Sequence, residues 1–305
     1  MTSAFVRFLA RRLAGGILLV LLVSSASLVA GHFMAGDATT ELAAGGAGAD
    51  VIALERARLG LDRSLGSQFL TWFAGLGRFD LGTSAAYRRP VSELVGERAL
   101  NTAVLAGAAL VIALALGLPL GMLTGSRPGG VLNLIVTPAS IALVSCPPIV
   151  GALALTLLAV RTGWLSIAPG SIAVPALALG LPFAAMLERL QSRATADALA
   201  APNLVATAAR GVPRARLIWV HAGRQSLQPV LGIFGIVLGA LFGGSLAVEY
   251  ISGWPGLGRL MYDALMGRDM YLVAGCALAG GAALAAGNLI SDILRAAVDP
   301  RVTLQ

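Results

Sequence analysis

Six long stretches of the sequence contain no Asp, Glu, Lys or Arg, and no other feature constrains the fold as strongly. Each has between 22 and 33 residues, and together they cover 13–36, 99–126, 128–160, 162–187, 225–248 and 270–291. A helix needs about 20 apolar residues to cross roughly 30 Å of hydrocarbon. An ionised side chain in that layer costs several kcal/mol. We therefore predict an all-α polytopic membrane protein with six transmembrane helices, one per stretch.

The overall composition supports the membrane class. Hydrophobic residues make up 57% of the chain and charged residues only 12%, whereas soluble domains have about 25% charged residues. The net charge of +7 does not indicate a nucleic-acid partner. The basic residues lie in short stretches between apolar runs and do not cluster on one polar face.

Several residue types restrict the chemistry of the chain. All 22 basic residues are Arg, so the Lys that a Walker A loop uses to reach the β- and γ-phosphates is missing. Neither the two cysteines, Cys146 and Cys276, nor the two histidines, His32 and His221, have metal-ligand or redox spacing. We predict that this chain is not an enzyme and binds no metal or cofactor of its own.

The first apolar stretch follows Arg7, Arg11 and Arg12, as a secretory signal would. Signal peptides have an apolar region of only about 7–15 residues. Because this stretch is longer and five more follow it, we predict an uncleaved first transmembrane helix.

The distribution of Arg predicts the orientation, because short cytoplasmic loops carry an excess of basic residues. With the N-terminus inside, twelve Arg lie on the cytoplasmic side: Arg7, Arg11, Arg12, Arg127, Arg189, Arg193, Arg210, Arg214, Arg216, Arg224, Arg295 and Arg301. The short outer connections have three, namely Arg161, Arg259 and Arg268. We therefore predict that both termini lie in the cytoplasm and that residues 37–98 form an extracytoplasmic segment.

The predicted extracytoplasmic segment has two parts. Residues 37–50 are rich in Ala and Gly, so we expect irregular structure there. Leu65, Phe69, Trp72 and Phe73 continue to Leu76 with the spacing of one helix face. This predicts an amphipathic helix that lies in the headgroup layer or packs on the transmembrane bundle.

Proline and glycine recur inside the apolar stretches. The prolines are Pro119, Pro138, Pro147, Pro148 and Pro182, and glycines are frequent over 239–244 and 280–287. Membranes tolerate a broken backbone hydrogen bond where neighbouring helices or a water-filled cavity replace it. Such kinks are typical of a bundle that opens and closes, and also of any tightly packed bundle.

Residues 188–224 form the longest predicted cytoplasmic connection. Helix-forming residues dominate 195–209, apart from Pro202 and Asn203, and the sequence Arg210-Gly211-Val212-Pro213 then ends the helix. A second apolar and basic run, 215–228, leads to Pro229 and the fifth stretch. Composition alone leaves two interpretations open: a loop on anionic headgroups, or a rigid protrusion that contacts a protein.

This connection resembles the cytoplasmic coupling loop of binding-protein-dependent ABC importer permeases. In the peptide and nickel branch the loop resembles Y-V-R-T-A-R-A-K-G-L followed by H-A-L-R-N-A-L-I-P-V. The chain reads N-L-V-A-T-A-A-R-G over 203–211 and H-A-G-R-Q-S-L-Q-P-V over 221–230. The identical positions are Gly211, His221, Ala222, Arg224, Leu227, Pro229 and Val230, and Arg210 replaces a Lys.

Further short matches to the same branch run in order along the whole chain. They are Ala35-Gly36-Asp37, Leu59-Gly60-Leu61-Asp62, Phe79-Asp80-Leu81-Gly82, Pro90-Val91, Gly243-Gly244, Glu249, Trp254-Pro255-Gly256-Leu257-Gly258, Arg268-Asp269, Asn288, Asp292 and Asp299-Pro300-Arg301. The chain is identified as a member of the dipeptide, oligopeptide and nickel branch, similar to the first, B-type permease of each pair.

The resemblance implies a multi-pass protein of the bacterial inner membrane with a type I ABC importer permease fold. Residues 1–98 would form an N-terminal part and 99–305 a five-helix core. It implies as partners a second homologous permease, two ATPase subunits that bind ATP and Mg²⁺, an extracytoplasmic solute-binding protein and membrane lipids. The ATPase would contact the coupling residues Ala206, Ala209, Arg210, Gly211, Arg214 and Arg216. Peptides are the expected solutes, with nickel chelates, glutathione or another small solute as alternatives.

Glu249 and Asn288 lie in or near apolar stretches, where a polar group serves translocation or structure. The sequence of the loop also departs from the branch. The acidic residue of the general loop motif has no equivalent here, since Val205 and its neighbours occupy that place, and several basic positions are Ala or Gln. The expected contacts with the ATPase therefore differ in detail.

Two other functional classes are weaker. An intramembrane Ser/His protease would need Ser145 or Ser226 at the same membrane depth as His32 or His221, and the predicted topology provides no such pair. A secondary transporter tends to have ionisable groups in the middle of its spans, and the centres of these stretches have none.

Overall fold

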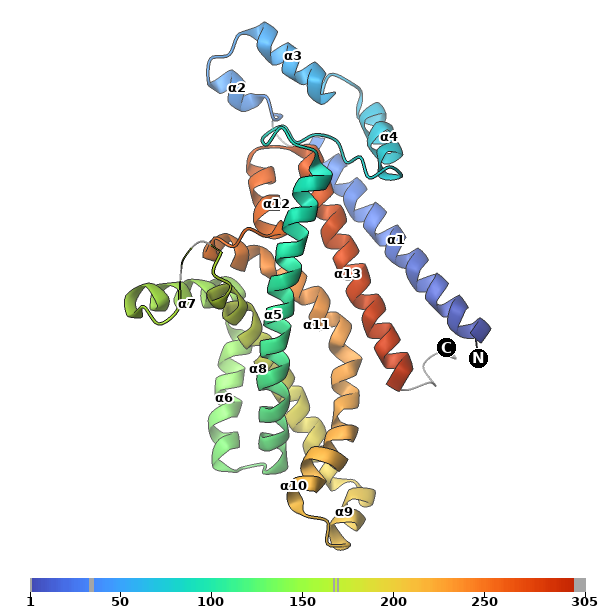
Figure 1. Ribbon diagram of the computed structural model, residues 1–305, viewed down its shortest axis with the longest axis vertical. Helices are drawn as coiled ribbons and strands as arrows, with labels where there is room; N and C mark the ends of the chain where they lie inside the picture. Colours follow the sequence, from blue (N-terminus) through green and yellow to red (C-terminus); the bar gives the residue numbers. More distant parts are fainter. Residues whose placement is uncertain (1, 33–35, 167, 169, 299–305) are drawn as a thin grey trace. The chain divides into compact units, whose positions relative to one another are not determined.

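The computed structural model describes residues 2–32, 36–166, 168 and 170–298, and nearly all regular structure in these ranges is helical. The first five helices are α1 (Thr2–His32), α2 (Thr40–Ala44), α3 (Ala49–Leu59), α4 (Leu65–Leu76) and α5 (Val91–Ser126). They are followed by α6 (Val131–Ser145), α7 (Pro148–Thr162), α8 (Ala173–Ala200), α9 (Pro202–Ala209), α10 (Arg214–Arg216), the π-helix η1 (Leu217–Ala222), α11 (Gly223–Ser252), α12 (Leu257–Met266) and α13 (Met270–Val298). The predicted all-α class is confirmed (Figure 1).

Five helical segments are long and apolar enough to cross a membrane, within 10–30, 91–126, 173–200, 214–252 and 270–293. The third predicted stretch, 128–160, is different, because it forms two helices, α6 and α7, that meet at 108°. The expectation of one continuous helix there is therefore wrong. The number of spans is five, or six if the bent pair crosses once, so the count of six stays a prediction.

Two adjacent prolines explain the bend. The residue before a proline is pushed out of the helical region, and Cys146 accordingly has φ −81° and ψ 119°. Pro147 is also extended, and Pro148 then starts α7 at a position where a missing N–H has no consequence.

The chain packs as two compact units. The central unit is built on Val104–Trp254 with the part of α13 from Ala286, and the N-terminal unit on Ala10–Ala103 with Pro255–Ala285. The predicted division after residue 98 stays a prediction. The predicted motif residues Ala35 and Asp299-Pro300-Arg301 lie outside the described residues.

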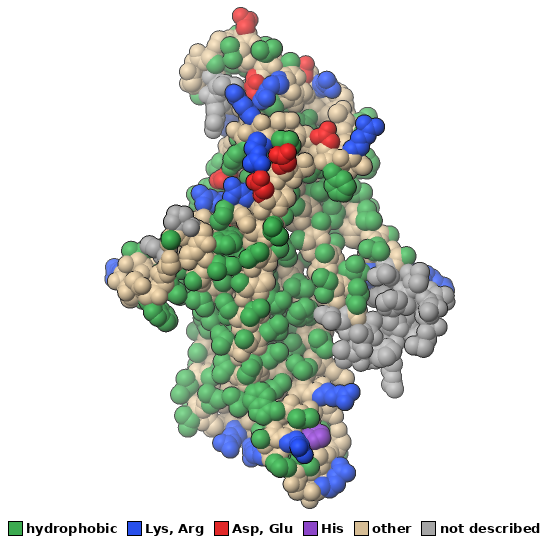
Figure 2. All heavy atoms as spheres, viewed as in Figure 1, with side chains coloured by type: hydrophobic (Ala, Val, Ile, Leu, Met, Phe, Trp, Pro, Cys, Tyr) green, Lys and Arg blue, Asp and Glu red, His purple; other side chains and the backbone are tan. Residues whose placement is uncertain are grey.

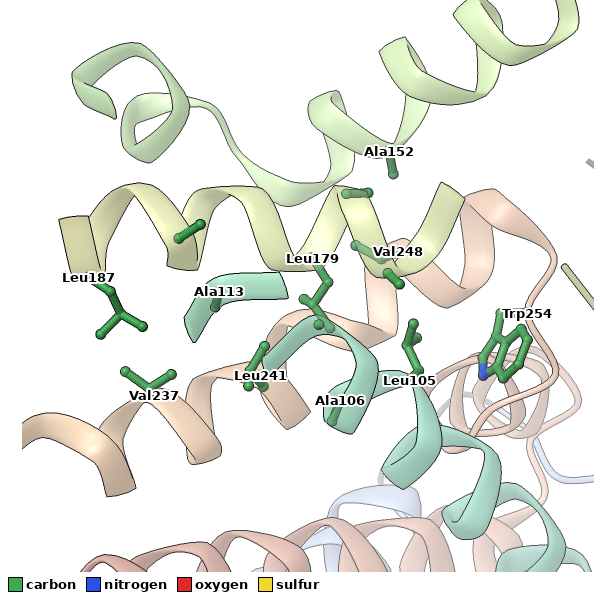
Figure 3. Packing of buried hydrophobic residues seen from close by; sticks show 14 of the residues in the cluster. Leu105, Ala106, Ala113, Ala152, Leu179, Leu187, Val237, Leu241, Val248 and Trp254 are labelled. Atoms are coloured by element: carbon green, nitrogen blue, oxygen red, sulfur yellow. The ribbon is translucent and has the colours of Figure 1, made fainter. Parts of the chain in front are cut away.

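The core of the central unit consists of small and branched apolar side chains. Figure 3 shows Leu105 and Ala106 of α5, Leu179 of α8 and Leu241 of α11 brought together. Leu105, Leu179 and Leu241 have no exposed surface. Since lipid is as apolar as leucine, close packing rather than exclusion of water holds such helices together.

Three glycines allow α5 to lie directly against α8. Gly117, Gly121 and Gly125 are spaced four residues apart and therefore share one helix face. A Cβ on Gly117 would lie 2.6 Å from the carbonyl oxygen of Ala184, and one on Gly125 would overlap that of Ser192. We call these three residues the glycine stripe. Small residues at a spacing of four allow membrane helices to approach closely.

The N-terminal unit contains the predicted amphipathic helix as α4. Trp72 is buried with Leu28 and Ala274, and Phe69 and Leu76 pack against this cluster. Trp72, Phe69 and Leu76 of the stripe therefore pack on helices, whereas Phe73 is 45% exposed.

Elsewhere in the N-terminal unit, two sequence expectations change. Residues 37–50 are not wholly irregular, because Thr40–Ala44 form the short helix α2. Between α11 and α13, Leu257–Met266 form α12, an amphipathic helix that was not predicted from the sequence. Its buried side chains are Leu257, Leu260 and Ala264.

Asp37 stabilises the start of the segment 37–50. Burial raises the pKa of its carboxyl group, but hydrogen bonds from Thr39 and Arg56 lower it by more, so the net pKa lies below the usual value of 3.8. Arg56 forms an ion pair with Asp37 at 2.8 Å.

Asp269, part of the Arg268-Asp269 motif, fixes a second connection. Its carboxylate accepts hydrogen bonds from the Ser84 hydroxyl at 2.6 Å and from the Ala85 N–H at 2.7 Å. It also accepts the Leu272 N–H of the first turn of α13. The motif residue therefore caps a helix and ties the loop before α5 to it.

Candidate functional site: the elbow between α8 and α11

The predicted coupling segment is a short helix followed by a sharp turn. The expected helix over 195–209 is not one helix: α8 continues to Ala200, and α9 begins at Pro202. Ala201 is extended between them, as the residue before a proline must be. The predicted stop after α9 is confirmed, because Gly211 has φ +84°, a conformation that glycine adopts without steric cost. We call residues 201–216 the elbow.

One buried leucine packs the elbow against the helices. Leu204 packs with Ala198 of α8 and Ala222 of η1. The six predicted coupling residues, in contrast, are all exposed: Ala206, Ala209, Arg210, Gly211, Arg214 and Arg216. In Figure 1 the elbow lies at the lower end of α8 and α11, and arginines gather there in Figure 2.

The arginines of the elbow differ in what they bind. Arg214 donates to the backbone carbonyl of Ser126 at 3.0 Å and so fixes the elbow to the end of α5. Arg210 makes only a local hydrogen bond, to the Thr207 hydroxyl at 3.2 Å. The guanidinium of Arg210 is therefore held by the elbow itself and not by the rest of the bundle.

The elbow returns to α11 through the π-helix η1. These six residues include the motif residue His221, which is exposed, and Ala222, which is buried. π-turns inside α-helices are rare and frequently lie at functional sites. Gly223 follows at once, and a Cβ there would lie 3.3 Å from the Met122 methyl group of α5.

Above the elbow, a buried carboxylate joins three helices. Glu188 of α8 is 2% exposed. The Thr124 hydroxyl of α5 donates to its Oε1 at 2.7 Å, and the Ser140 hydroxyl of α6 donates to its Oε2 at 2.8 Å. Both carboxylate oxygens thus have a partner, which a buried charged group requires.

One helical turn further along α8, Gln191 makes a second buried connection. Its Nε2 donates to the Ser226 hydroxyl of α11 at 2.6 Å and to Thr195 at 3.2 Å. Its Oε1 is buried without a hydrogen-bond partner. Polar side chains of this kind hold membrane helices together, so α8 is linked to α5, α6 and α11 directly above the elbow.

Sequence analysis overlooked these connections because it treated Glu188 as the end of an apolar stretch. A signal was present nonetheless. Glu188, Gln191 and Thr195 are spaced i, i+3 and i+7 and therefore lie on one face of a helix. A polar stripe that continues an apolar helix indicates a buried interhelical contact.

The two other predicted polar residues have different environments. Glu249 of α11 is fully buried, three residues before the helix ends at Ser252. Asn288 of α13 is exposed, although α11 passes nearby, since a Cβ on Gly235 would lie 3.4 Å from the Asn288 Oδ1. The structure does not bring Glu249 or Asn288 to the elbow.

Comparison with known proteins decides the family. The model of the inner membrane component of binding-protein-dependent transport systems matches residues 117–304, and the model of the N-terminal part of such membrane components matches residues 5–103. This chain belongs to that family. The permease is similar to the glutathione transport system permease protein GsiC of Salmonella choleraesuis (strain SC-B67), with 30% identity over 97% of this chain and 98% of the relative. The GsiC protein of Escherichia coli (strain K12) is 29% identical over the same shares.

Family membership confirms several predictions from the sequence. The permease is a multi-pass inner membrane component of an ABC importer and not an enzyme. Such a component works with a separate ATPase and a substrate-binding protein. That the chain binds no metal or cofactor of its own stays a prediction.

Proposed function

We propose that this permease and a second, similar permease together form the translocation path of an ATP-driven importer. Two ATPase subunits would bind ATP and Mg²⁺, since this chain lacks the lysine of a P-loop. Both termini would be cytoplasmic and residues 37–98 extracytoplasmic, facing the solute-binding protein. The excess of arginine at the elbow and near the N-terminus supports this orientation.

The elbow is the proposed contact with the ATPase. The observation that supports this role most is its combination of a fixed backbone and exposed side chains: Leu204 and Arg214 hold it to the bundle, whereas Ala206, Ala209 and Arg210 face outward. A rigid protrusion transmits a push, because a displacement at its tip moves the helices to which it is packed.

The connections of Glu188 and Gln191 indicate where such a push would go. Movement of α9 reaches α8 through Leu204, and α8 is hydrogen-bonded to α5, α6 and α11. We propose that these four helices move as one body when the importer alternates between its outward-facing and inward-facing states. Alternating access of this kind is the rocking of one packed bundle against another.

For the solute, we propose peptides, with glutathione as the first compound to test. The relatives with 29–30% identity are named as glutathione transport permeases. Selection at the first step would belong to the separate binding protein. Uptake of radiolabelled glutathione, a dipeptide and a nickel chelate by cells with and without this gene would rank the three classes.

Reconstitution with its ATPase, partner permease and binding protein tests the role of the elbow. The double variant Arg210→Glu/Arg216→Glu reverses two exposed charges, and we expect binding-protein-stimulated ATP hydrolysis to fall about tenfold. The control Arg193→Glu/Arg224→Glu makes the same change of charge at exposed residues of the central unit that lie outside the elbow and should not reduce it. Equal losses in both variants would contradict the proposal.

Cross-linking tests the contact directly in a chain without Cys146 and Cys276. Ala209→Cys should form a cross-link with the ATPase, whereas the control Trp164→Cys, at a site that is 75% exposed, should not. An impermeant maleimide should label Ala209→Cys only from the cytoplasmic side. Labelling only from outside the cell would overturn both the orientation and the proposed role.

A further inference from the structure

A surface pocket of 570 Å³ lies in the central unit beside the elbow. One side is formed by the end of α5 and the start of α6, with Leu123, Arg127 and Val131. The other side is formed by α10 and η1, with Arg214 and Trp219. The proposed contact with the ATPase does not explain a hollow at this place.

The charged side chains of the pocket are both cationic. Among its described lining residues are Arg127 and Arg214 and no acidic residue. Arg214 is oriented by its hydrogen bond to the Ser126 carbonyl, which uses one of the five N–H donors of the guanidinium. Two guanidinium groups that line one pocket are suited to a phosphate group, which Arg binds through paired hydrogen bonds.

The remaining lining is apolar and unusually exposed. Val131 is 77% exposed, Trp219 47% and Leu123 40%. In a membrane protein such side chains contact lipid, and Trp is enriched at the level of the headgroups. Figure 2 shows hydrophobic side chains covering the helices above the arginines of this end. The pocket thus has a cationic part beside an apolar part.

This combination distinguishes between two sources of phosphate. A soluble phosphate would match the arginines only, whereas a phospholipid also matches Leu123, Val131 and Trp219. Basic pockets between transmembrane helices on the cytoplasmic side are suited to anionic lipid headgroups. We infer that this pocket binds an anionic phospholipid, with the headgroup phosphate on Arg127 and Arg214 and the first acyl carbons along the apolar side chains.

A lipid bound here would connect the turn after α5 with the beginning of η1. Since Arg214 belongs to the elbow, the lipid would restrict the movement of the elbow against α5. The inference requires only that the chain lies in a membrane. It does not depend on the ATPase contact or on the direction of transport.

Native mass spectrometry of the purified full-length permease tests the inference. Phosphatidylglycerol is added and compared with phosphatidylcholine, for the wild type and for Arg127→Gln/Arg214→Gln. We expect phosphatidylglycerol to remain bound to the wild type and its affinity to fall about tenfold or more in the variant. The control Arg193→Gln/Arg224→Gln removes the same charge from exposed residues of the central unit outside this pocket and should change the affinity less than about twofold.

A second variant guards against loss of the fold, because Arg214 also braces the elbow. Arg127→Glu leaves that brace intact and should repel the anionic lipid while the melting temperature stays unchanged. Equal binding of phosphatidylcholine would overturn the inference. So would displacement of the lipid by millimolar glycerol phosphate, which would indicate a site for soluble phosphate, or unchanged lipid binding by both variants.

Discussion

Gly121 in the glycine stripe and Gly211 in the elbow show two separate reasons for a glycine. At Gly121 the backbone is helical, but a Cβ would lie 2.6 Å from the Gln191 Cβ and 2.7 Å from the Glu188 carbonyl oxygen. At Gly211 no atom lies within 4 Å of such a Cβ, but φ is +84°. The first glycine provides space between helices, and the second provides a backbone conformation.

The difference extends to the regions around these glycines. Around Gly121, side chains are buried and hydrogen-bonded to other helices, so the helices themselves determine the arrangement. Around Gly211, almost every side chain is exposed. A region that is exposed but has a defined backbone is suited to a partner protein. Substitutions should therefore alter stability in the stripe and coupling in the elbow.

The largest effect is expected for Gly121→Leu. The new side chain must displace Gln191 and the backbone of α8, and overpacking of this kind costs about 3 kcal/mol. The control is Gly107→Leu on the same helix, where no atom lies within 4 Å of a Cβ. The melting temperature in detergent should be strongly lowered for Gly121→Leu only. Equal melting temperatures would show that α5 and α8 do not pack so closely.

A smaller effect is expected for Glu188→Ala. It removes two buried hydrogen bonds, those from Thr124 and Ser140, and interhelical bonds in membranes contribute about 0.6–1.7 kcal/mol each. Glu188→Gln keeps a hydrogen-bond acceptor in a side chain of the same size, so its free energy of unfolding should fall less. Thermal unfolding of the two variants gives the order. If the Glu188→Ala variant were as stable as the Glu188→Gln variant, the hydrogen bonds of Glu188 would not contribute to holding the helices together.

The smallest effect on stability is expected for Gly211→Ala. A left-handed residue other than glycine costs about 1–2 kcal/mol, and no atomic overlap is added. The control Gly232→Ala also meets no atom within 4 Å, but its φ is not positive, so it should slightly stabilise α11. We expect binding-protein-stimulated ATP hydrolysis to fall more for Gly211→Ala than the change in melting temperature would suggest. If ATP hydrolysis fell only in proportion to the loss of stability, the two glycines would not have separate roles.

Much of the helical architecture could be predicted from the sequence, because charge-free stretches and glycine stops report local preferences. The stop at Gly211 and the stripe from Leu65 to Leu76 are examples. The bend at Pro147 was also readable, since two adjacent prolines end a helix. It was missed because length alone was used to count spans.

The buried connections could not be predicted in the same way. Glu188 appeared to mark a loop because an ionised group is costly in a membrane. In the structure its two side-chain oxygens accept hydrogen bonds from Thr124 and Ser140, which are 64 and 48 residues away in the sequence. The brace from Arg214 to Ser126 is likewise a contact over 88 residues. Such pairs are determined by tertiary packing. The polar stripe of α8 indicates that a buried contact exists, but no local pattern reports which distant residues make it.

The π-helix η1 has a geometric consequence for the elbow. A wide turn accommodates one residue more than an α-helical turn, and each residue of an α-helix rotates the chain by about 100°. Shortening η1 by one residue would therefore swing α9 around the axis of α11 through roughly a quarter of a circle. Every side chain of the elbow would be unchanged, yet it would point at a different neighbour. The number of residues in η1, whatever their identity, thus determines the direction in which the elbow points around the axis of α11.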